Sequence, residues 1–128
     1  VLIKDNHLAG VATSRLARTV FDMLNRLEAA GSNSPFVQVE ADSLAQVEAL
    51  LTVVGVDAIL LDNFSLGDLG RAVGLRDAHG LAGKVVLEAS GGVTLDTVRA
   101  VAETGVDRIS VGALTHAAAA LDLSLERC

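Results

Sequence analysis

The fold is decided by the stretch Val85-Val86-Leu87-Glu88-Ala89-Ser90-Gly91-Gly92-Val93-Thr94. Its valine-rich apolar run is typical of a strand that is covered on both faces. The glycine pair Gly91-Gly92 allows a tight turn and a close approach of the backbone to a ligand. Thr94 is expected to cap a following helix, whose free amides then face the loop and favour an anion such as phosphate. A lone glycine pair is equally typical of an ordinary strand-to-helix turn.

Composition excludes several classes of protein. The chain has 128 residues, about the size of one domain, with 51% hydrophobic and 2% aromatic residues. The scarcity of aromatic rings and the net charge of −6 argue against nucleic-acid binding. Cys128 is the single cysteine, so no disulfide forms within the chain, which fits the reducing cytoplasm. No apolar run has transmembrane length, and no signal peptide is evident, so we expect no membrane association.

Short apolar runs alternate with helical patterns along the whole chain. The predicted strands are residues 1–3, 36–39, 58–61, 85–89 and 108–111, and residues 121–125 could form a last one. The predicted helices are residues 13–30, 42 or 43 to about 54, 66–78, 94–103 and 116–120. This alternation predicts an α/β fold in which helices pack outside a parallel sheet.

The sheet could belong to a (β/α) barrel or to an open doubly wound fold, and spacing favours the barrel. Glu40, Asp62, Ser90 and Gly112 each follow an apolar run, at intervals of 22, 28 and 22 residues. Polar residues at the carboxyl ends of successive strands gather on one rim of a barrel, where such enzymes place their chemistry. Because five strands are too few to close an eight-stranded barrel, and the chain opens inside a strand, we expect further sequence upstream.

Four positions are candidates for chemistry at this rim. Lys4, in the polar run Lys4-Asp5-Asn6-His7, could meet a phosphate or a carboxylate as a point charge, or simply belong to a polar loop. Glu40 and Asp62 could bind hydroxyls or Mg²⁺, although Glu40 could be a solvated strand end and Asp62 a helix cap. Gly112 repeats the strand-glycine-helix pattern of Gly91-Gly92, and two such turns in consecutive units indicate a phosphate cup. The three histidines show no zinc-ligand spacing.

Five motifs in this order carry a resemblance to a known family. They are Ile3-Lys4-Asp5-Asn6-His7, Val39-Glu40, Leu60-Leu61-Asp62-Asn63, Glu88-Ala89-Ser90-Gly91-Gly92 and Ser110-Val111-Gly112-Ala113-Leu114-Thr115-His116. Together they resemble the C-terminal half of quinolinate phosphoribosyltransferase, the carboxylating nicotinate-nucleotide pyrophosphorylase. On this resemblance, residues 1–128 are the C-terminal part of an irregular (β/α) barrel domain, without the N-terminal domain and the first barrel strands.

The resemblance implies a transferase of de novo NAD biosynthesis. Such an enzyme joins quinolinate to phosphoribosyl pyrophosphate with Mg²⁺, releases pyrophosphate and CO₂, and is a cytoplasmic homodimer or higher homo-oligomer. The implied catalytic and substrate-binding residues are Lys4, Glu40 and Asp62, with Mg²⁺ held through the two carboxylates. The implied phosphate-binding residues are Ser90, Gly91, Gly92 and Gly112.

One departure from the family limits this reading. The arginines and the second lysine that bind the acceptor carboxylates in the family have no match in this chain. We therefore expect the chain alone to be inactive. A related barrel transferase with another acceptor and a non-catalytic phosphate-binding module remain alternatives.

Overall fold

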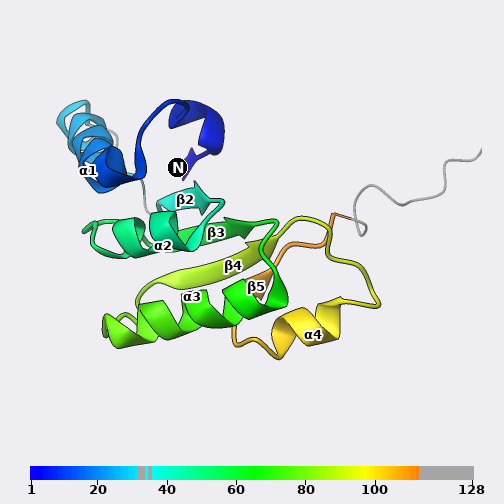
Figure 1. Ribbon diagram of the computed structural model, residues 1–128. Helices are drawn as coiled ribbons and strands as arrows, with labels where there is room; N and C mark the ends of the chain where they lie inside the picture. The colour runs from blue at the N-terminus through cyan, green and yellow to red at the C-terminus, as the bar shows by residue number, and fades with distance from the viewer. Residues whose placement is uncertain (32–33, 35, 113–128) are drawn as a thin grey trace, which may run out of the picture.

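The computed structural model describes residues 1–31, 34 and 36–112, which form one layer of parallel strands with helices packed against it (Figure 1). The strands are β1 (Leu2–Ile3), β2 (Gln38–Ala41), β3 (Ala58–Asp62), β4 (Val86–Ser90) and β5 (Arg108–Ile109). The helices are α1 (Thr13–Ala29), α2 (Leu44–Leu51), α3 (Leu66–Ala78) and α4 (Val98–Ala102), and a 3-10 turn η1 spans Asp5–His7. The helix expected at residues 116–120 and the strand at 121–125 lie outside the described residues.

The order of the strands distinguishes between the two predicted architectures. Within the described residues the strands pair in parallel in the order β1-β2-β3-β4-β5, so each strand lies beside its neighbour in sequence. A doubly wound sheet reverses direction at a switch point and carries helices on both faces. Here the order never reverses, as in a (β/α) barrel, and β1 and β5 are the free edges of an open sheet. The barrel-type winding is therefore confirmed.

All four helices cover the same face of the sheet. The odd-numbered strand residues, such as Val39, Ile59 and Leu87, are fully buried against helical side chains in one continuous core. Leu16 and Val20 enter this core from α1, and α2, α3 and α4 each add buried residues as well. Figure 1 shows α2 and α3 lying side by side along the sheet. Burial of these apolar side chains is the main force that holds the helices on this face.

The opposite face, here called the open face, consists of the even-numbered strand residues. In the described part of the chain no helix covers it, and its half-buried members include Gln38, Glu40, Leu60, Asp62, Glu88 and Ser90. Five of these six residues are polar or charged and could form hydrogen bonds. Parallel sheets are normally covered on both faces. An open face of this composition corresponds to the lumen side of a barrel.

Several element boundaries differ from the prediction: β2 begins at Gln38, α2 ends at Leu51, α4 begins at Val98 and β5 ends at Ile109. Two of these differences have a clear physical cause. β2 begins at Gln38, where the amide of Gln38 first donates to the carbonyl of Val1, so Glu40 lies inside the strand rather than after it. The predicted helix 94–103 is wrong at its start, because α4 begins at Val98. The hydroxyl of Thr97 accepts from the amide of Thr94 at 2.9 Å and closes a turn there. Thr94 is therefore not the helix cap.

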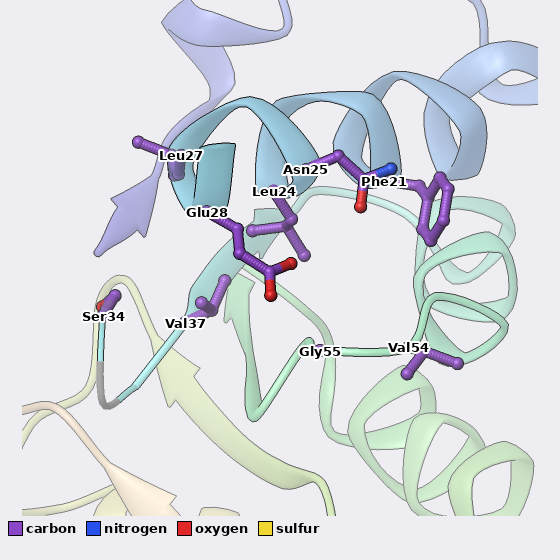
Figure 2. Close-up of a pocket in the computed structure, with 9 residues that line it drawn as sticks. All are labelled: Phe21, Leu24, Asn25, Leu27, Glu28, Ser34, Val37, Val54 and Gly55. Carbon is purple, nitrogen blue, oxygen red and sulfur yellow. The ribbon is translucent and has the colours of Figure 1, made fainter. Parts of the chain in front are cut away.

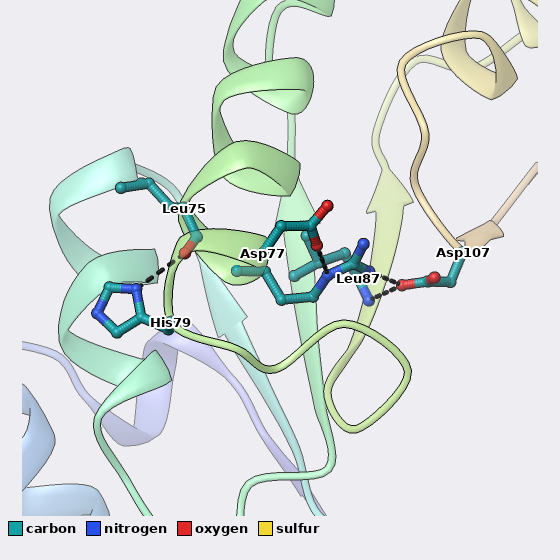
Figure 3. A network of polar contacts seen from close by, with 6 residues as sticks. Leu75, Asp77, His79, Leu87 and Asp107 are labelled. Carbon is teal, nitrogen blue, oxygen red and sulfur yellow. Dashed lines mark hydrogen bonds and ion pairs between the residues drawn. The ribbon is translucent and has the colours of Figure 1, made fainter.

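At the amino end of the sheet, the tripeptide Gly-Val-Asp occurs twice, before β3 and before β5. A carboxylate oxygen of Asp57 accepts from the amide of Val37, and one of Asp107 accepts from the amide of Leu87, both at 2.7 Å. Asp107 also pairs with Arg76 of α3, a guanidinium that is 5% exposed. Figure 3 shows the carboxylate of Asp107 turned into this network. The two aspartates fasten neighbouring strands together by the same contacts.

Candidate functional site

The carboxyl ends of the strands bring the predicted site residues to one edge, here called the rim. Lys4 follows β1 directly and is exposed, Asp62 and Ser90 are the last residues of β3 and β4, and Gly112 comes three residues after β5. Asp62 and Ser90 are directly opposite each other in the parallel ladder. Adjacent strands lie about 4.8 Å apart, so these two side chains are neighbours. The structure thus gathers the predicted residues at the carboxyl end of one sheet.

An acidic hollow occupies one part of the rim. Its cavity of about 260 Å³ is lined by four carboxylates and by Gln46 and small loop residues. The carboxylates are those of Asp5, Glu40, Asp42 and Asp62. The amide of Asp5 lies 3.4 Å from a carboxylate oxygen of Glu40, a long contact that joins η1 to β2. This hollow is suited to a cation or to sugar hydroxyls rather than to an anion in direct contact with the carboxylates.

Asp62 does not cap the next helix. That role belongs to Ser65, whose hydroxyl oxygen accepts from the amide of Asp68 at 3.2 Å at the start of α3. Asp62 instead accepts from the side-chain amide of Asn63 at 2.7 Å and is otherwise turned to the rim. The capping alternative for Asp62 is therefore excluded, and its carboxylate is available at the hollow.

Asn63 is a residue that the sequence reading did not assign to the site. Its backbone is left-handed, with φ of 55°, and its amide donates to the carbonyl of Ser90 at 2.9 Å. A Cβ added to Gly91 would lie 2.2 Å from the side-chain oxygen of Asn63. Gly91, at φ of 88°, is thus required by the close approach of Asn63. The signal in sequence was asparagine after a strand, since asparagine tolerates left-handed backbone.

The other glycines of the predicted cup face open space. Gly92 has φ of 61°, and a Cβ at Gly92 or at Gly112 would meet no atom within 4 Å. A second cavity of about 360 Å³ lies beside the Ser90–Gly92 turn and extends to α3 and α4. Because α4 begins only at Val98 and has five residues, its amides do not directly follow Gly92, contrary to the prediction. The backbone of the glycine turn itself is left to offer donors.

The turn that carries Lys4 has its own fixed geometry. The amide of His7 donates to the carbonyl of Lys4 at 3.0 Å, and the amide of Lys4 donates to Nδ1 of His7 at 3.1 Å. These reciprocal bonds hold the backbone of η1 at the rim beside the acidic hollow. The exposed ammonium of Lys4 is therefore attached to an ordered turn. Lys4 directly precedes Asp5, one of the carboxylates that line the hollow.

The carboxylates of the rim could hold Mg²⁺ only together with the phosphates of a substrate. In residues 1–31, 34 and 36–112, no group of three or more His, Cys, Asp or Glu side chains is arranged to hold a metal ion. Mg²⁺ usually keeps several waters and takes one or two carboxylates together with the phosphates of a substrate. Glu40 and Asp62 in the hollow could supply such a pair of carboxylates.

An apolar hollow lies at the other end of the molecule, away from the rim. It has a volume of about 350 Å³ and is formed where α1 meets the segments before β2 and β3 (Figure 2). Phe21 and Val54 stand at this hollow and are 44% and 84% exposed. It contains no residue of the predicted site. In addition, no helix in the described part is long and apolar enough to cross a membrane.

The winding of the sheet and the polar rim define a protein of the (β/α) barrel class. Within that class, the sequence profile described as "Quinolinate phosphoribosyl transferase, C-terminal domain" matches residues 1–126. The chain therefore belongs to the quinolinate phosphoribosyltransferase family.

Relatives support this membership and show its extent. The carboxylating nicotinate-nucleotide pyrophosphorylase of Mycobacterium leprae is 43% identical over 125 residues, which are 98% of this chain and 40% of that protein. A chloroplastic protein of the same name from Oryza sativa is 39% identical and is covered over 36% of its length. The chain thus spans about two fifths of the relatives that it matches.

Solved structures agree with the fold. The nicotinate-nucleotide pyrophosphorylase of Ehrlichia chaffeensis superposes with a TM-score of 0.70 at 40% identity, over 91% of this chain and 38% of that chain. The protein of the same name from Francisella tularensis gives 0.69 at 36% identity, over 89% and 36%. The open sheet described here therefore has the arrangement of strands and helices found in part of these larger proteins.

Proposed function

We propose that this chain carries the ribose- and phosphate-binding part of an enzyme that transfers a phosphoribosyl group to quinolinate. The products would be nicotinate mononucleotide, pyrophosphate and CO₂, in the biosynthesis of NAD. The observation that carries the proposal is the pairing of Asp62 with Ser90 across β3 and β4. This pairing sets an acidic hollow beside a glycine turn, and phosphoribosyl pyrophosphate presents hydroxyls suited to the first and a phosphate suited to the second.

Each residue of the rim has a role in this proposal. Glu40 and Asp62 bind the ribose hydroxyls and share Mg²⁺ with the pyrophosphate, and Lys4 contacts a negatively charged substrate group. Ser90, Gly92 and Gly112 hold the 5′-phosphate through backbone and hydroxyl donors. Gly91 acts through its close packing on Asn63, which fixes the shape of the turn.

The chemistry follows from charge. As the bond between ribose C1 and pyrophosphate lengthens, positive charge develops on the ribose ring. Carboxylates already fixed in the hollow stabilise that charge without reorganisation, so their effect appears in the transition state. Mg²⁺, when bound with the substrate, would neutralise the charge that grows on the departing pyrophosphate. The ring nitrogen of quinolinate bonds to C1 as the bond from C1 to pyrophosphate breaks, and the ring carbon that loses CO₂ takes up a proton in its place.

The acceptor half of the site is expected to come from sequence outside this chain. Quinolinate and phosphoribosyl pyrophosphate bring many negative charges, which need several cations in a partly dry site. Of the described arginines near the start of the chain, Arg18 pairs with Asp22 on the surface of α1, and Arg15 and Arg26 are also exposed on that helix. None of these three follows a strand. A bidentate grip on the carboxylates of quinolinate therefore requires arginines from elsewhere.

A chimera tests the proposal directly. Residues 1–128 would replace the matched segment of the Mycobacterium leprae relative, and formation of nicotinate mononucleotide would be followed with quinolinate, phosphoribosyl pyrophosphate and Mg²⁺. We expect turnover by the chimera and none above blank by the 128-residue chain alone. A folded chimera that binds phosphoribosyl pyrophosphate but does not consume quinolinate would favour another acceptor. A folded chimera that binds neither substrate would contradict the proposal.

Assembly and location are further parts of this proposal. We also propose that the protein is a homodimer or a higher homo-oligomer, as the family resemblance implies. Light scattering of the purified chimera checks this, and a monomer would contradict it. We propose a cytoplasmic location for this protein, although the compartment varies among relatives, since one is named as chloroplastic and another as mitochondrial. Binding of nucleic acid or membranes is not expected at a net charge of −6.

A further inference from the structure

Three polar side chains of the open face form a hydrogen-bonded chain across the sheet. The amide nitrogen Nε2 of Gln38 in β2 donates to Oε2 of Glu88 in β4 at 2.9 Å. The hydroxyl of Ser110, which follows β5, donates to Oε1 of the same carboxylate. Glu88 is half-buried, and each of its oxygens accepts from a neutral donor. One carboxylate thus connects three strands of the sheet on the side away from the helices.

The position of these hydrogen bonds relative to the rim suggests their role. Glu88 comes two residues before Ser90, and Ser110 comes two residues before Gly112. Since residues two apart in a strand share a face, Glu88 lies one layer of side chains below Ser90 on the open face. The bond between Glu88 and Ser110 therefore connects the two segments that lead into the proposed phosphate loops.

Backbone hydrogen bonds alone hold β5 only weakly beside β4. β5 has two residues, and its ladder with β4 pairs Glu88 with Arg108 and Ala89 with Ile109. Beyond it, the amide of Ser110 donates to the carbonyl of Ala89 at 2.9 Å. With so short a ladder, the hydroxyl of Ser110 on Glu88 is a second restraint at the point where the chain turns toward Gly112.

The nearby guanidinium of Arg108 does not explain why a carboxylate stands at position 88. Arg108 is its register partner in β5, but the guanidinium of Arg108 stacks over the ring of Phe36, 5.5 Å from its centroid. Phe36 precedes β2, so that contact directs the guanidinium toward the amino end of the sheet and away from the rim. The carboxylate of Glu88 is used as a double acceptor of hydrogen bonds.

We infer that Glu88 is a positioning residue: by holding Ser110, with Gln38 as its anchor, it sets the distance between the Ser90–Gly92 turn and Gly112. The identity of the ligand in that gap, a phosphate ester, rests on the proposed function. The positioning itself does not, because it concerns the free protein. Both oxygens of the carboxylate accept, one from Ser110 and one from Gln38, so removal of the carboxylate releases both side chains at once.

The first experiment measures position without a ligand. In ¹H–¹⁵N spectra of the chain, Glu88→Ala should shift the amide signals of Ser90, Gly91, Gly92 and Gly112. Glu48→Ala, a matched change at an exposed residue of α2, should leave these signals in place. Unmoved signals in Glu88→Ala would overturn the inference even if the protein binds phosphate.

The second experiment measures binding in the chimera described above. Glu88→Ala should weaken binding of ribose 5-phosphate by about tenfold, as expected for the loss of the bond from Ser110 to a charged acceptor, and raise KM more than it lowers kcat. The exchange Gln38→Glu with Glu88→Gln restores a donor and an acceptor between the two positions and leaves an amide oxygen for Ser110. It should therefore recover most of the affinity.

The outcomes separate positioning from electrostatics. Recovery in the double variant supports positioning, because the charge has then moved to β2 while the bonds are restored. A double variant as weak as Glu88→Ala would show that the charge at position 88 matters, and would overturn the inference. If the unmodified chimera binds no ribose 5-phosphate, the proposed function fails, and the amide shifts still decide the role of Glu88.

Discussion

The two ends of the sheet use aspartate in opposite ways. At the amino end, Asp57 and Asp107 turn their carboxylates inward, onto the backbone amides of the preceding strand. At the carboxyl end, Asp62 turns its carboxylate to a hollow and accepts only from its neighbour Asn63 among the described contacts. An aspartate that is satisfied by the fold stabilises it, whereas one left at a cavity is free to bind. This is the division between the stable and the reactive face of (β/α) barrels.

Removal of Asp107 is expected to have the largest effect. Asp107→Ala takes the partner from the buried guanidinium of Arg76 and the acceptor from the amide of Leu87. The second ion pair of Arg76, with Asp77 at 2.9 Å, remains. We expect a loss of about 3 kcal/mol in the free energy of unfolding, measured by urea denaturation, because a buried charge is then only partly compensated.

Two further variants calibrate this result. Asp57→Ala removes the same kind of bond to backbone but no buried ion pair, and should cost about 1.5 kcal/mol. Asp22→Ala breaks the exposed pair with Arg18 and should change stability by less than about 0.5 kcal/mol. Equal losses for Asp107→Ala and Asp57→Ala would show that the ion pair of Arg76 with Asp107 contributes nothing, because both variants lose one bond to a backbone amide.

The opposite pattern is expected at the rim. Asp62→Asn in the chimera should lower kcat/KM by about 100-fold, because a charge that acts in the transition state is lost. Stability should change by less than about 0.5 kcal/mol, since the half-exposed side chain fastens no second strand. Steady-state kinetics and urea denaturation on the same sample check both parts. If activity and stability fall together, Asp62 is structural and the contrast between the two ends disappears.

Sequence predicted the elements better than it predicted the contacts between them. The bounds of α3, residues 66–78, agree with the prediction, because Ser65, the apolar spacing and Gly80 are local signals. The start of β2 was misplaced because it depends on pairing with the short edge strand β1, which no local pattern encodes. The turn before α4 was misplaced because Thr94 and Thr97 are both capable of capping, and the structure uses the second in the turn.

The site shows the same limit. Lys4, Glu40, Asp62, Ser90 and Gly112 could be placed at one rim because every parallel strand ends there. The bond from Gln38 to Glu88 joins residues 50 positions apart and follows only from the register of three strands. The contact of Gly91 with Asn63 likewise depends on how two loops meet. Such contacts are tertiary, so a single sequence does not contain a local signal for them.

Two glycines of the rim allow the contrast to be tested inside the site. Gly91→Ala forces a Cβ to within 2.9 Å of the backbone nitrogen of Asn63, at a positive φ, and should cost about 2 kcal/mol of stability. Gly112→Ala places its Cβ in open space and should change stability by less than about 0.5 kcal/mol. In calorimetry with ribose 5-phosphate, Gly112→Ala should nevertheless weaken binding several-fold. Unchanged affinity in Gly112→Ala would remove Gly112 from the proposed cup.

The smallest effect on activity is expected at a rim residue whose role is purely structural. Ser65 lies beside the Ser90–Gly92 turn and lines the same cavity, yet its hydroxyl is engaged at the start of α3 with the amide and the carboxylate of Asp68. Ser65→Ala should therefore cost about 1 kcal/mol of stability through loss of the helix cap. In the chimera, kcat and KM should stay within about twofold of the unmodified values, as expected for a residue that does not touch the substrate.

One further substitution distinguishes loss of the helix cap from loss of a contact with substrate. Ser65→Asp keeps an acceptor for the amide of Asp68 but places a second carboxylate beside that of Asp68, so it should recover only part of the lost stability. It should also bring negative charge to the cavity beside Ser90. If Ser65→Ala lowers activity at unchanged stability, the hydroxyl binds substrate, and position at the rim alone would then predict function. If stability falls and activity does not, the free carboxylate of Asp62 and the engaged hydroxyl of Ser65 differ because their partners differ, although both lie at the same end of the sheet.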